Sequence, residues 1–121
     1  MAIKKILLVD DSPTERHYIG EILTKAGFTV LMAEDGEKAV ALAKIQKPDL
    51  IVMDVVMPGL NGFQATRAIT KDPETQNIPV ILCTTKDQET DRVWGMRQGA
   101  KDYVVKPVEP AELLGKIAAL G

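Results

Sequence analysis

The stretch Lys4-Lys5-Ile6-Leu7-Leu8-Val9-Asp10-Asp11 is a short apolar run that stops at two carboxylates. The same arrangement recurs where residues 50–53 stop at Asp54 and where residues 80–83 stop at Thr84. Unbroken rather than alternating hydrophobicity is typical of strands covered on both faces, as in parallel sheets flanked by helices. The sequence therefore predicts three buried parallel strands, each followed by polar residues.

Two weaker apolar runs, at residues 28–33 and 103–105, predict two further strands, and helical patterns fill the intervals. The first helix is expected to begin at Ser12, because Ser suits the cap, Pro13 the first helical position and Glu15 a capping box. Its inward side chains are expected to be Ile19, Ile22, Leu23 and Ala26. Further helices are expected near residues 36–46, 62–70, 88–98 and 111–120.

Strand and helix thus alternate about five times, which predicts an α/β fold, a doubly wound five-stranded parallel sheet with five helices. Successive parallel strands need crossover helices, and those crossovers are right-handed. In such sheets ligands bind beyond the carboxyl ends of the strands, where the strand order reverses. The residues that follow four of the strands should share this edge, and they are Asp10, Asp11, Asp54, Thr84 and Lys106.

The composition is that of one ordinary domain, with 121 residues, 15 Lys plus Arg, 17 Asp plus Glu and a net charge of −2. We expect a single unit over residues 1–121 without an output domain. The mixed charge signs argue against nucleic acid or anionic lipid as a partner. No apolar run is long enough for membrane insertion and no export signal is recognisable, so a cytoplasmic protein is expected. The single cysteine, Cys83, should be buried and reduced.

Three carboxylates in one crevice repel one another, so a cation is needed to keep all of them ionised at neutral pH. Oxygen ligands without a nearby His or second Cys favour a hard ion, Mg²⁺ above all, with Mn²⁺ as an alternative. Lys106 would add a second positive charge and Thr84 a hydroxyl. Such a site suits a dianionic phosphoryl group, and aspartate is an established acceptor of one.

Four motifs together resemble the receiver domain of bacterial two-component response regulators, over essentially the whole chain. They are Leu8-Val9-Asp10-Asp11-Ser12, Met53-Asp54-Val55-Val56-Met57-Pro58-Gly59, Thr84-Thr85 and Val105-Lys106-Pro107. Each alone could be a helix cap, a turn or strand residues, and only their joint order and spacing is specific. The resemblance implies a flavodoxin-like, CheY-like (βα)5 fold with Asp54 as the phosphoacceptor. It also implies the roles of the neighbours: Mg²⁺ ligation by Asp11, Asp54 and the Val56 carbonyl, assistance by Asp10, and a grip on the phosphoryl oxygens by Thr84 and Lys106.

The family resemblance further implies a conformational switch. Thr84 would move toward the phosphoryl group, and the ring of Tyr103 would turn inward to fill the space that it leaves. The surface changed in this way would span the fourth helix, fifth strand and fifth helix, residues 88–120, where a local charge change biases a two-state element. The same resemblance implies a cis peptide bond at Lys106-Pro107, which the relaxed preference of X-Pro bonds permits.

More narrowly, residues 57–67 and 84–91 resemble the single-domain regulators of chemotaxis-like systems that control type IV pilus twitching motility. The chain differs from flagellar chemotaxis regulators at Val56, two residues after the acceptor, and at Lys86, two residues after Thr84. Neither side chain readily positions an attacking water, as a polar or acidic residue would. We therefore expect a comparatively long-lived phosphoaspartate.

The leading hypothesis is a monomeric, non-enzymatic signalling module that takes a phosphoryl group from a CheA-like histidine kinase and binds an effector through residues 88–120. A phosphate sink that drains the kinase without an effector stays open. A small aspartate-based phosphohydrolase is disfavoured, because Val56 stands where such enzymes carry a second aspartate. A flavodoxin-like binder is disfavoured, because the acidic turn Asp10-Asp11-Ser12-Pro13 would repel a phosphate ligand. His17 is given no role, and Trp94 suits core packing and partner contact equally.

Overall fold

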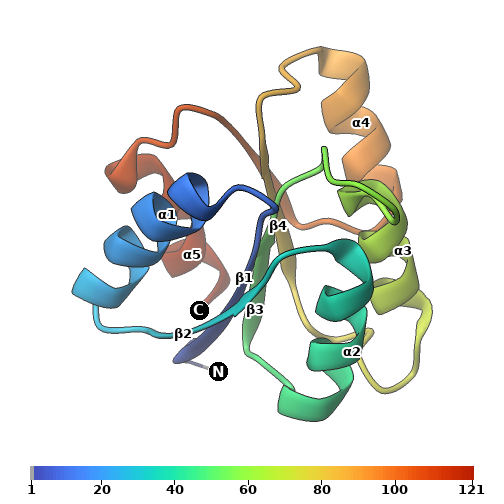
Figure 1. Cartoon of the computed structure of the whole chain (residues 1–121), viewed down its shortest axis with the longest axis horizontal. Coiled ribbons are helices and arrows are strands. Elements are labelled where there is room, and N and C mark those ends of the chain that lie inside the picture. Colours follow the sequence, from blue (N-terminus) through green and yellow to red (C-terminus); the bar gives the residue numbers. More distant parts are fainter. Residues whose placement is uncertain (1) are drawn as a thin grey trace.

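The computed structural model describes residues 2–121, in which strands and helices alternate as the apolar runs predict (Figure 1). The strands are β1 (Lys5–Val9), β2 (Thr29–Ala33), β3 (Leu50–Met53), β4 (Val80–Thr84) and β5 (Asp102–Val105). The helices are α1 (Pro13–Lys25), α2 (Gly36–Gln46), α3 (Gly62–Lys71), α4 (Glu89–Arg97) and α5 (Pro110–Leu120). The predicted boundaries agree to within one or two residues, and Thr84 ends β4 instead of following it.

All neighbouring strands are parallel, in the order β2-β1-β3-β4-β5, so the predicted doubly wound sheet is confirmed. The strand order reverses between β1 and β3, which lie side by side in register, with Val9 opposite Met53. The backbone N–H of Asp54 donates to the Val9 carbonyl at 2.9 Å. Asp10 and Asp54 therefore leave the sheet together at the switch point, where ligands bind in folds of this kind.

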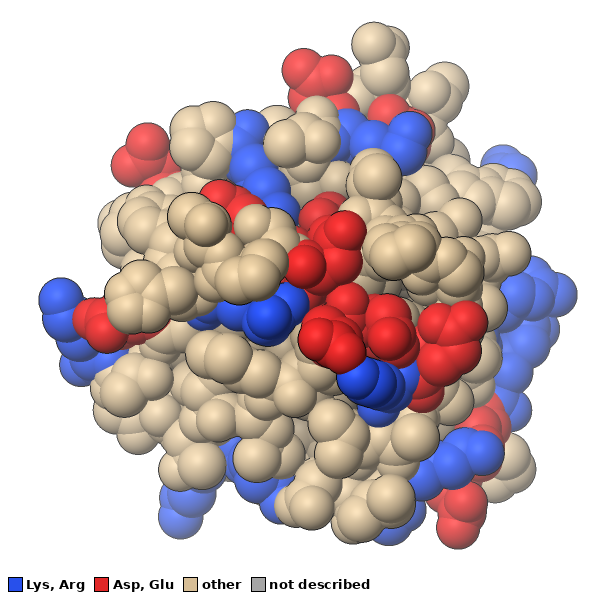
Figure 2. Space-filling view, in the orientation of Figure 1, with Lys and Arg blue, Asp and Glu red and all other residues tan. Residues whose placement is uncertain are grey.

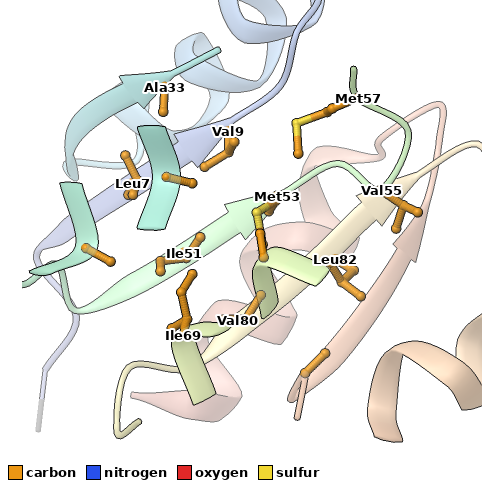
Figure 3. Close-up of a cluster of buried hydrophobic side chains, with 14 of the residues drawn as sticks. Leu7, Val9, Ala33, Ile51, Met53, Val55, Met57, Ile69, Val80 and Leu82 are labelled. Atoms are coloured by element: carbon orange, nitrogen blue, oxygen red, sulfur yellow. The ribbon is translucent and has the colours of Figure 1, made fainter. Parts of the chain in front are cut away.

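Helices cover both faces of the sheet, α1 and α5 on one side and α2, α3 and α4 on the other (Figure 1). On the side of α2 and α3, Leu7, Val9, Ile51 and Met53 point from the central strands into one cluster, together with Ile69 of α3 (Figure 3). Their neighbours along the strands point to the opposite face and form a second cluster with α1 and α5. Burial of each large side chain contributes about 1.5–3 kcal/mol, so the central strands are the most strongly held part of the domain.

The beginning of α1 differs from the sequence prediction in one detail. Ser12 caps the helix, accepting a hydrogen bond from the Glu15 backbone N–H at 3.3 Å. The Glu15 carboxylate does not complete a capping box, because it lies 3.4 Å from the Lys106 ammonium instead. Along the same helix Ile19 and Leu23 are buried as predicted, whereas Ile22 is half-buried. Ala26, predicted to be buried, is exposed, because α1 ends at Lys25 and the chain turns away there.

The loop between β3 and α3 is held by close backbone contacts at two glycines. A Cβ atom on Gly62 would lie 2.1 Å from the carbonyl oxygen of Asp54, and one on Gly36 would lie 2.3 Å from that of Leu60. The Gly62 N–H also donates to the Val55 carbonyl at 2.9 Å. The first residues of α2 and α3 therefore press directly on the loop that carries Asp54.

Helix α4 contacts the sheet in an unusual way, because Gly95 is its only buried residue. A Cβ atom on Gly95 would lie 2.8 Å from Leu82 and 3.5 Å from the Tyr103 ring, so the helix backbone itself rests on the sheet. The neighbouring side chains of Val93 and Trp94 are exposed. Trp94 is 51% exposed, which excludes the core-packing role that the sequence left open for it.

We expect Gly62→Ala to lower the free energy of unfolding by about 1–3 kcal/mol, because the new methyl group meets backbone that cannot move aside. Urea denaturation followed by circular dichroism would measure this. The matched control is Gly115→Ala in α5, where a Cβ atom would meet no neighbour within 4 Å. That control should gain up to about 1 kcal/mol from helix propensity. Equal effects of the two substitutions would contradict the close contact at Gly62.

Candidate functional site

The acidic residues predicted to share one edge of the sheet do meet there. Asp10 and Asp54 follow β1 and β3 and are 1% and 8% exposed, while Asp11 is exposed beside them. One carboxylate oxygen from each residue lies within 4.8 Å of the other two, a spacing that could hold a metal ion. Figure 2 shows acidic side chains gathered near the centre of this face of the molecule, with Lys and Arg side chains beside them.

Lys106 follows β5 and brings the positive charge into this cluster. Its ammonium donates to Asp10 Oδ2 at 2.7 Å and lies 3.4 Å from Asp54 Oδ2, and the side chain is only 9% exposed. Its peptide bond to Pro107 is cis, as the family resemblance implies. The predicted convergence of Asp10, Asp54 and Lys106 at the strand ends is thus present in the structure.

Backbone N–H groups fix the orientation of both buried carboxylates. Asp54 Oδ1 accepts from Val55 N–H at 2.7 Å and from Val56 N–H at 3.4 Å, so Oδ2 is the oxygen that faces Lys106. Asp10 Oδ1 accepts from Ser12 N–H at 3.0 Å. Val56 lies in the turn directly after Asp54 with its side chain in solvent, and its predicted part in metal binding stays a prediction.

Burial and charge act in opposite directions on Asp54 and Lys106. Burial raises the pKa of Asp54, the Lys106 ammonium opposes this rise, and the Asp10 carboxylate adds to it. Burial disfavours the charged form of Lys106, but its hydrogen bond to Asp10 and the nearby Asp54 carboxylate raise its pKa overall. Lys106 is therefore charged at neutral pH, while Asp54 resists ionisation, as expected where carboxylates outnumber cations.

Thr84 ends β4, and Tyr103, the second residue of β5, reaches the segment that follows Thr84. Thr84 is fully buried and its hydroxyl accepts a hydrogen bond from the Lys86 backbone N–H at 3.3 Å. The Tyr103 hydroxyl donates to the Lys86 carbonyl at 2.8 Å, and burial raises its pKa to about 12. The ring already points inward in this structure, so the predicted inward movement on activation stays a prediction.

The family model of the response regulator receiver domain matches residues 6–118. The chain belongs to the receiver-domain family. The fold, the order of the motifs and the geometry at the strand ends all agree with this membership, and the resemblance derived from the four motifs is confirmed.

This receiver domain is 61% identical to protein PilH of Pseudomonas aeruginosa over 116 residues, which cover 96% of either chain. It is 32% identical to the chemotaxis protein CheY4 of Vibrio cholerae, with a TM-score of 0.91 over 99% of this chain and all of that one. The receiver domain of the Pseudomonas aeruginosa sensor histidine kinase PA1611 is 35% identical, with a TM-score of 0.89 over 98% of this chain and 97% of that one. That structure contains a magnesium ion coordinated in the active site cleft.

Sequence reasoning missed two residues beside the cluster. Glu15 contacts Lys106, and Arg16 donates to the Asp10 carbonyl oxygen at 2.5 Å. The only sequence signal was their place in the first helical turn after the acidic pair. Cys83 is buried as predicted, and burial raises the pKa of its thiol to about 12. Among the described residues, none of the helices has the length and apolar character needed to cross a bilayer.

We expect Asp54→Asn to raise the free energy of unfolding at pH 7, because the amide replaces a buried carboxylate whose ionised form is disfavoured there. The pKa of Asp54 is higher in the folded than in the unfolded state, so the ionised carboxylate destabilises the wild type above the folded-state pKa. Below the ordinary pKa of 3.8 the carboxyl is protonated in both states, and the advantage of the Asn variant should vanish. Urea denaturation between pH 7 and pH 3.5, without divalent ions, measures the difference.

The control for this measurement is Asp49→Asn, where the sign is reversed. Asp49 accepts from the backbone N–H groups of Lys5 and Lys4, both at 2.9 Å, and these bonds hold the pKa of its carboxyl below the usual range. The stability that Asp49 contributes is present above its unfolded pKa and is lost as the pH falls. Asp49→Asn should therefore destabilise the domain at pH 7. A loss of stability in both variants would show that the ionised Asp54 carboxylate does not destabilise the folded domain.

Proposed function

We propose that this receiver domain accepts a phosphoryl group on Asp54 from a sensor histidine kinase in a Mg²⁺-dependent reaction and signals by a change of its surface. One observation carries the proposal, the three carboxylate oxygens within 4.8 Å of one another beside the Lys106 ammonium. Anionic groups of this number are expensive to gather in one place unless cations are to be bound there. The described site therefore fits the chemistry of a divalent ion and a phosphoryl group together.

The metal would be Mg²⁺, with Mn²⁺ as an alternative, held by Asp10, Asp11, Asp54 and the Val56 carbonyl. Carboxylates and a carbonyl are hard oxygen donors, which suits either ion, and Mg²⁺ usually keeps waters and phosphate oxygens for the rest of its shell. The ion supplies positive charge next to the transferred group when it is bound. The magnesium ion in the cleft of the PA1611 receiver domain supports this proposal.

In the proposed transfer, a carboxylate oxygen of Asp54 forms a bond to phosphorus as the P–N bond of the kinase phosphohistidine breaks. The imidazole nitrogen leaves with the electron pair of that bond. Lys106 and the Thr84 hydroxyl would hold the phosphoryl oxygens, so that positioning and charge neutralisation are the main contributions of the protein. Lys106 is already aimed at Asp54 Oδ2, at 3.4 Å.

The output would be binding, not catalysis of a reaction on another molecule. Residues 88–120 present the exposed apolar side chains of Val93, Trp94 and Val105, a composition suited to contact with an effector protein. The identity to PilH supports a role in a chemotaxis-like system that controls type IV pilus twitching motility, with a CheA-like kinase as donor. A phosphate sink without an effector is the second candidate, and Asp54 would accept the phosphoryl group in the same way.

The acceptor is tested by intact-mass spectrometry after incubation with acetyl phosphate. We expect one phosphoryl adduct that requires Mg²⁺, is absent in Asp54→Asn and persists for minutes after the donor is removed. EDTA added before the donor should prevent the adduct. The matched control is Asp35→Asn, which caps α2 outside the acidic cluster and should still accept the phosphoryl group. An adduct that survives in Asp54→Asn, or none in the wild type, would refute the proposal.

We predict that the slow decay depends on the aliphatic side chain of Val56. It is 54% exposed and follows Asp54 by two residues, so a polar group there could position a water against the phosphoryl group. Val56→Gln should shorten the lifetime of the adduct, by roughly threefold to tenfold. Val93→Gln, an equally polar change at an exposed site in α4, should leave the lifetime unchanged. Equal lifetimes of Val56→Gln and the wild type would contradict this assignment.

A further inference from the structure

The Glu15 carboxylate is the one acidic group around Lys106 that the proposed phosphoryl transfer leaves without a role. Its backbone is fixed in the first turn of α1 by the Ser12 cap, and its Oε1 lies 3.4 Å from the Lys106 ammonium. Unlike the aspartates, which follow strands of the sheet, Glu15 reaches the cluster from helix α1. Glu15 is thus a fourth carboxylate near the site, after Asp10, Asp11 and Asp54.

The Lys106 ammonium has three N–H donors, and three carboxylates surround it. Asp10 lies at 2.7 Å, and Asp54 and Glu15 each lie at 3.4 Å. Since the lysine side chain is only 9% exposed, solvent offers little room for a further partner. Once Asp54 carries the phosphoryl group, Asp10 and Glu15 are the two carboxylates that still compete with the phosphoryl oxygens for the Lys106 ammonium.

Glu15 is the partner that is easiest to displace. Its side chain is 34% exposed, whereas those of Asp10 and Asp54 are 2% and 10% exposed. A carboxylate that leaves Lys106 must be solvated elsewhere, and only Glu15 can turn into water at small cost. Asp10 is also tied to the Ser12 N–H, and Asp54 is the residue that receives the phosphoryl group.

We propose that Glu15 is a positioning residue that forms an ion pair with the Lys106 ammonium in the unphosphorylated domain and is displaced by a phosphoryl oxygen. This inference rests on the proposed function of Asp54 and adds a competing anion to it. While Glu15 is in place, it holds the ammonium between α1 and the sheet. When a phosphoryl group arrives, Glu15 opposes it in two ways, by repulsion and by competition for Lys106.

The proposal predicts that Glu15→Gln favours the phosphorylated form. Beryllium trifluoride, a stable mimic of the phosphoryl group, is the probe, and its binding with Mg²⁺ would be followed by changes in backbone amide NMR signals. We expect Glu15→Gln to bind the mimic about twofold to fivefold more tightly than the wild type, in keeping with a partly exposed ion pair. Glu15→Ala should show a similar gain, because it also frees Lys106.

The matched control is Glu21→Gln in the same helix, which removes the same charge from a carboxylate paired with Lys25 at 3.6 Å. Its affinity for the mimic should equal that of the wild type. Repeating Glu15→Gln in a Lys106→Met background tests whether the effect passes through the lysine. The gain in affinity should disappear in this background. If it came instead from a general loss of negative charge or from a structural change in α1, it would persist there.

The possible results separate the role of Glu15 from that of Asp54. If the wild type accepts a phosphoryl group but Glu15→Gln binds the mimic no more tightly, the role of Glu15 is wrong and the proposed function stands. A gain that persists in Lys106→Met also overturns it. If the wild type neither binds the mimic nor forms an adduct with acetyl phosphate, the proposed function itself fails, and the role of Glu15 fails with it.

Discussion

The crowding of carboxylates around the single ammonium of Lys106 is the interaction on which the site depends. Asp10 and Asp54 follow adjacent strands in register, and Lys106 reaches them from the end of the edge strand β5. Without the lysine, two buried carboxylates would face each other with no compensating charge, which costs several kcal/mol. The lysine makes this arrangement possible in the folded domain. The carboxylate charge that Lys106 does not neutralise suits a divalent ion.

The rest of the domain keeps this arrangement in place. The apolar clusters on both faces fix the central strands, so the residues after β1 and β3 have little freedom to separate. Gly36 and Gly62 let the ends of α2 and α3 approach the loop after Asp54 more closely than any other residue would allow. Stability is thus concentrated beneath the site, while the polar groups above it lie on short turns, as is common where a rigid scaffold positions reactive residues.

The central strands could be predicted because burial on both faces leaves an unbroken apolar run, and residues 50–53 are a clear example. The convergence of Asp10, Asp54 and Lys106 followed from the general rule that parallel strands end at one edge. The contact of Glu15 with Lys106 could not be predicted, because a capping box is a local pattern, whereas Lys106 lies 91 positions away in the sequence. The exposure of Ala26 depends on where α1 ends, and that of Trp94 on which side of α4 faces the sheet. Neither follows from the local sequence.

The contact of α4 with the sheet through Gly95 has a consequence for the diversity of such domains. Most surface helices send several side chains into the core, and their outer and inner positions are then constrained together. In α4 the backbone itself makes the contact, so none of its side chains is needed to hold the core together. The helix therefore leaves almost all of its side chains free to change with the binding partner, while the chemistry at the edge of the sheet is kept.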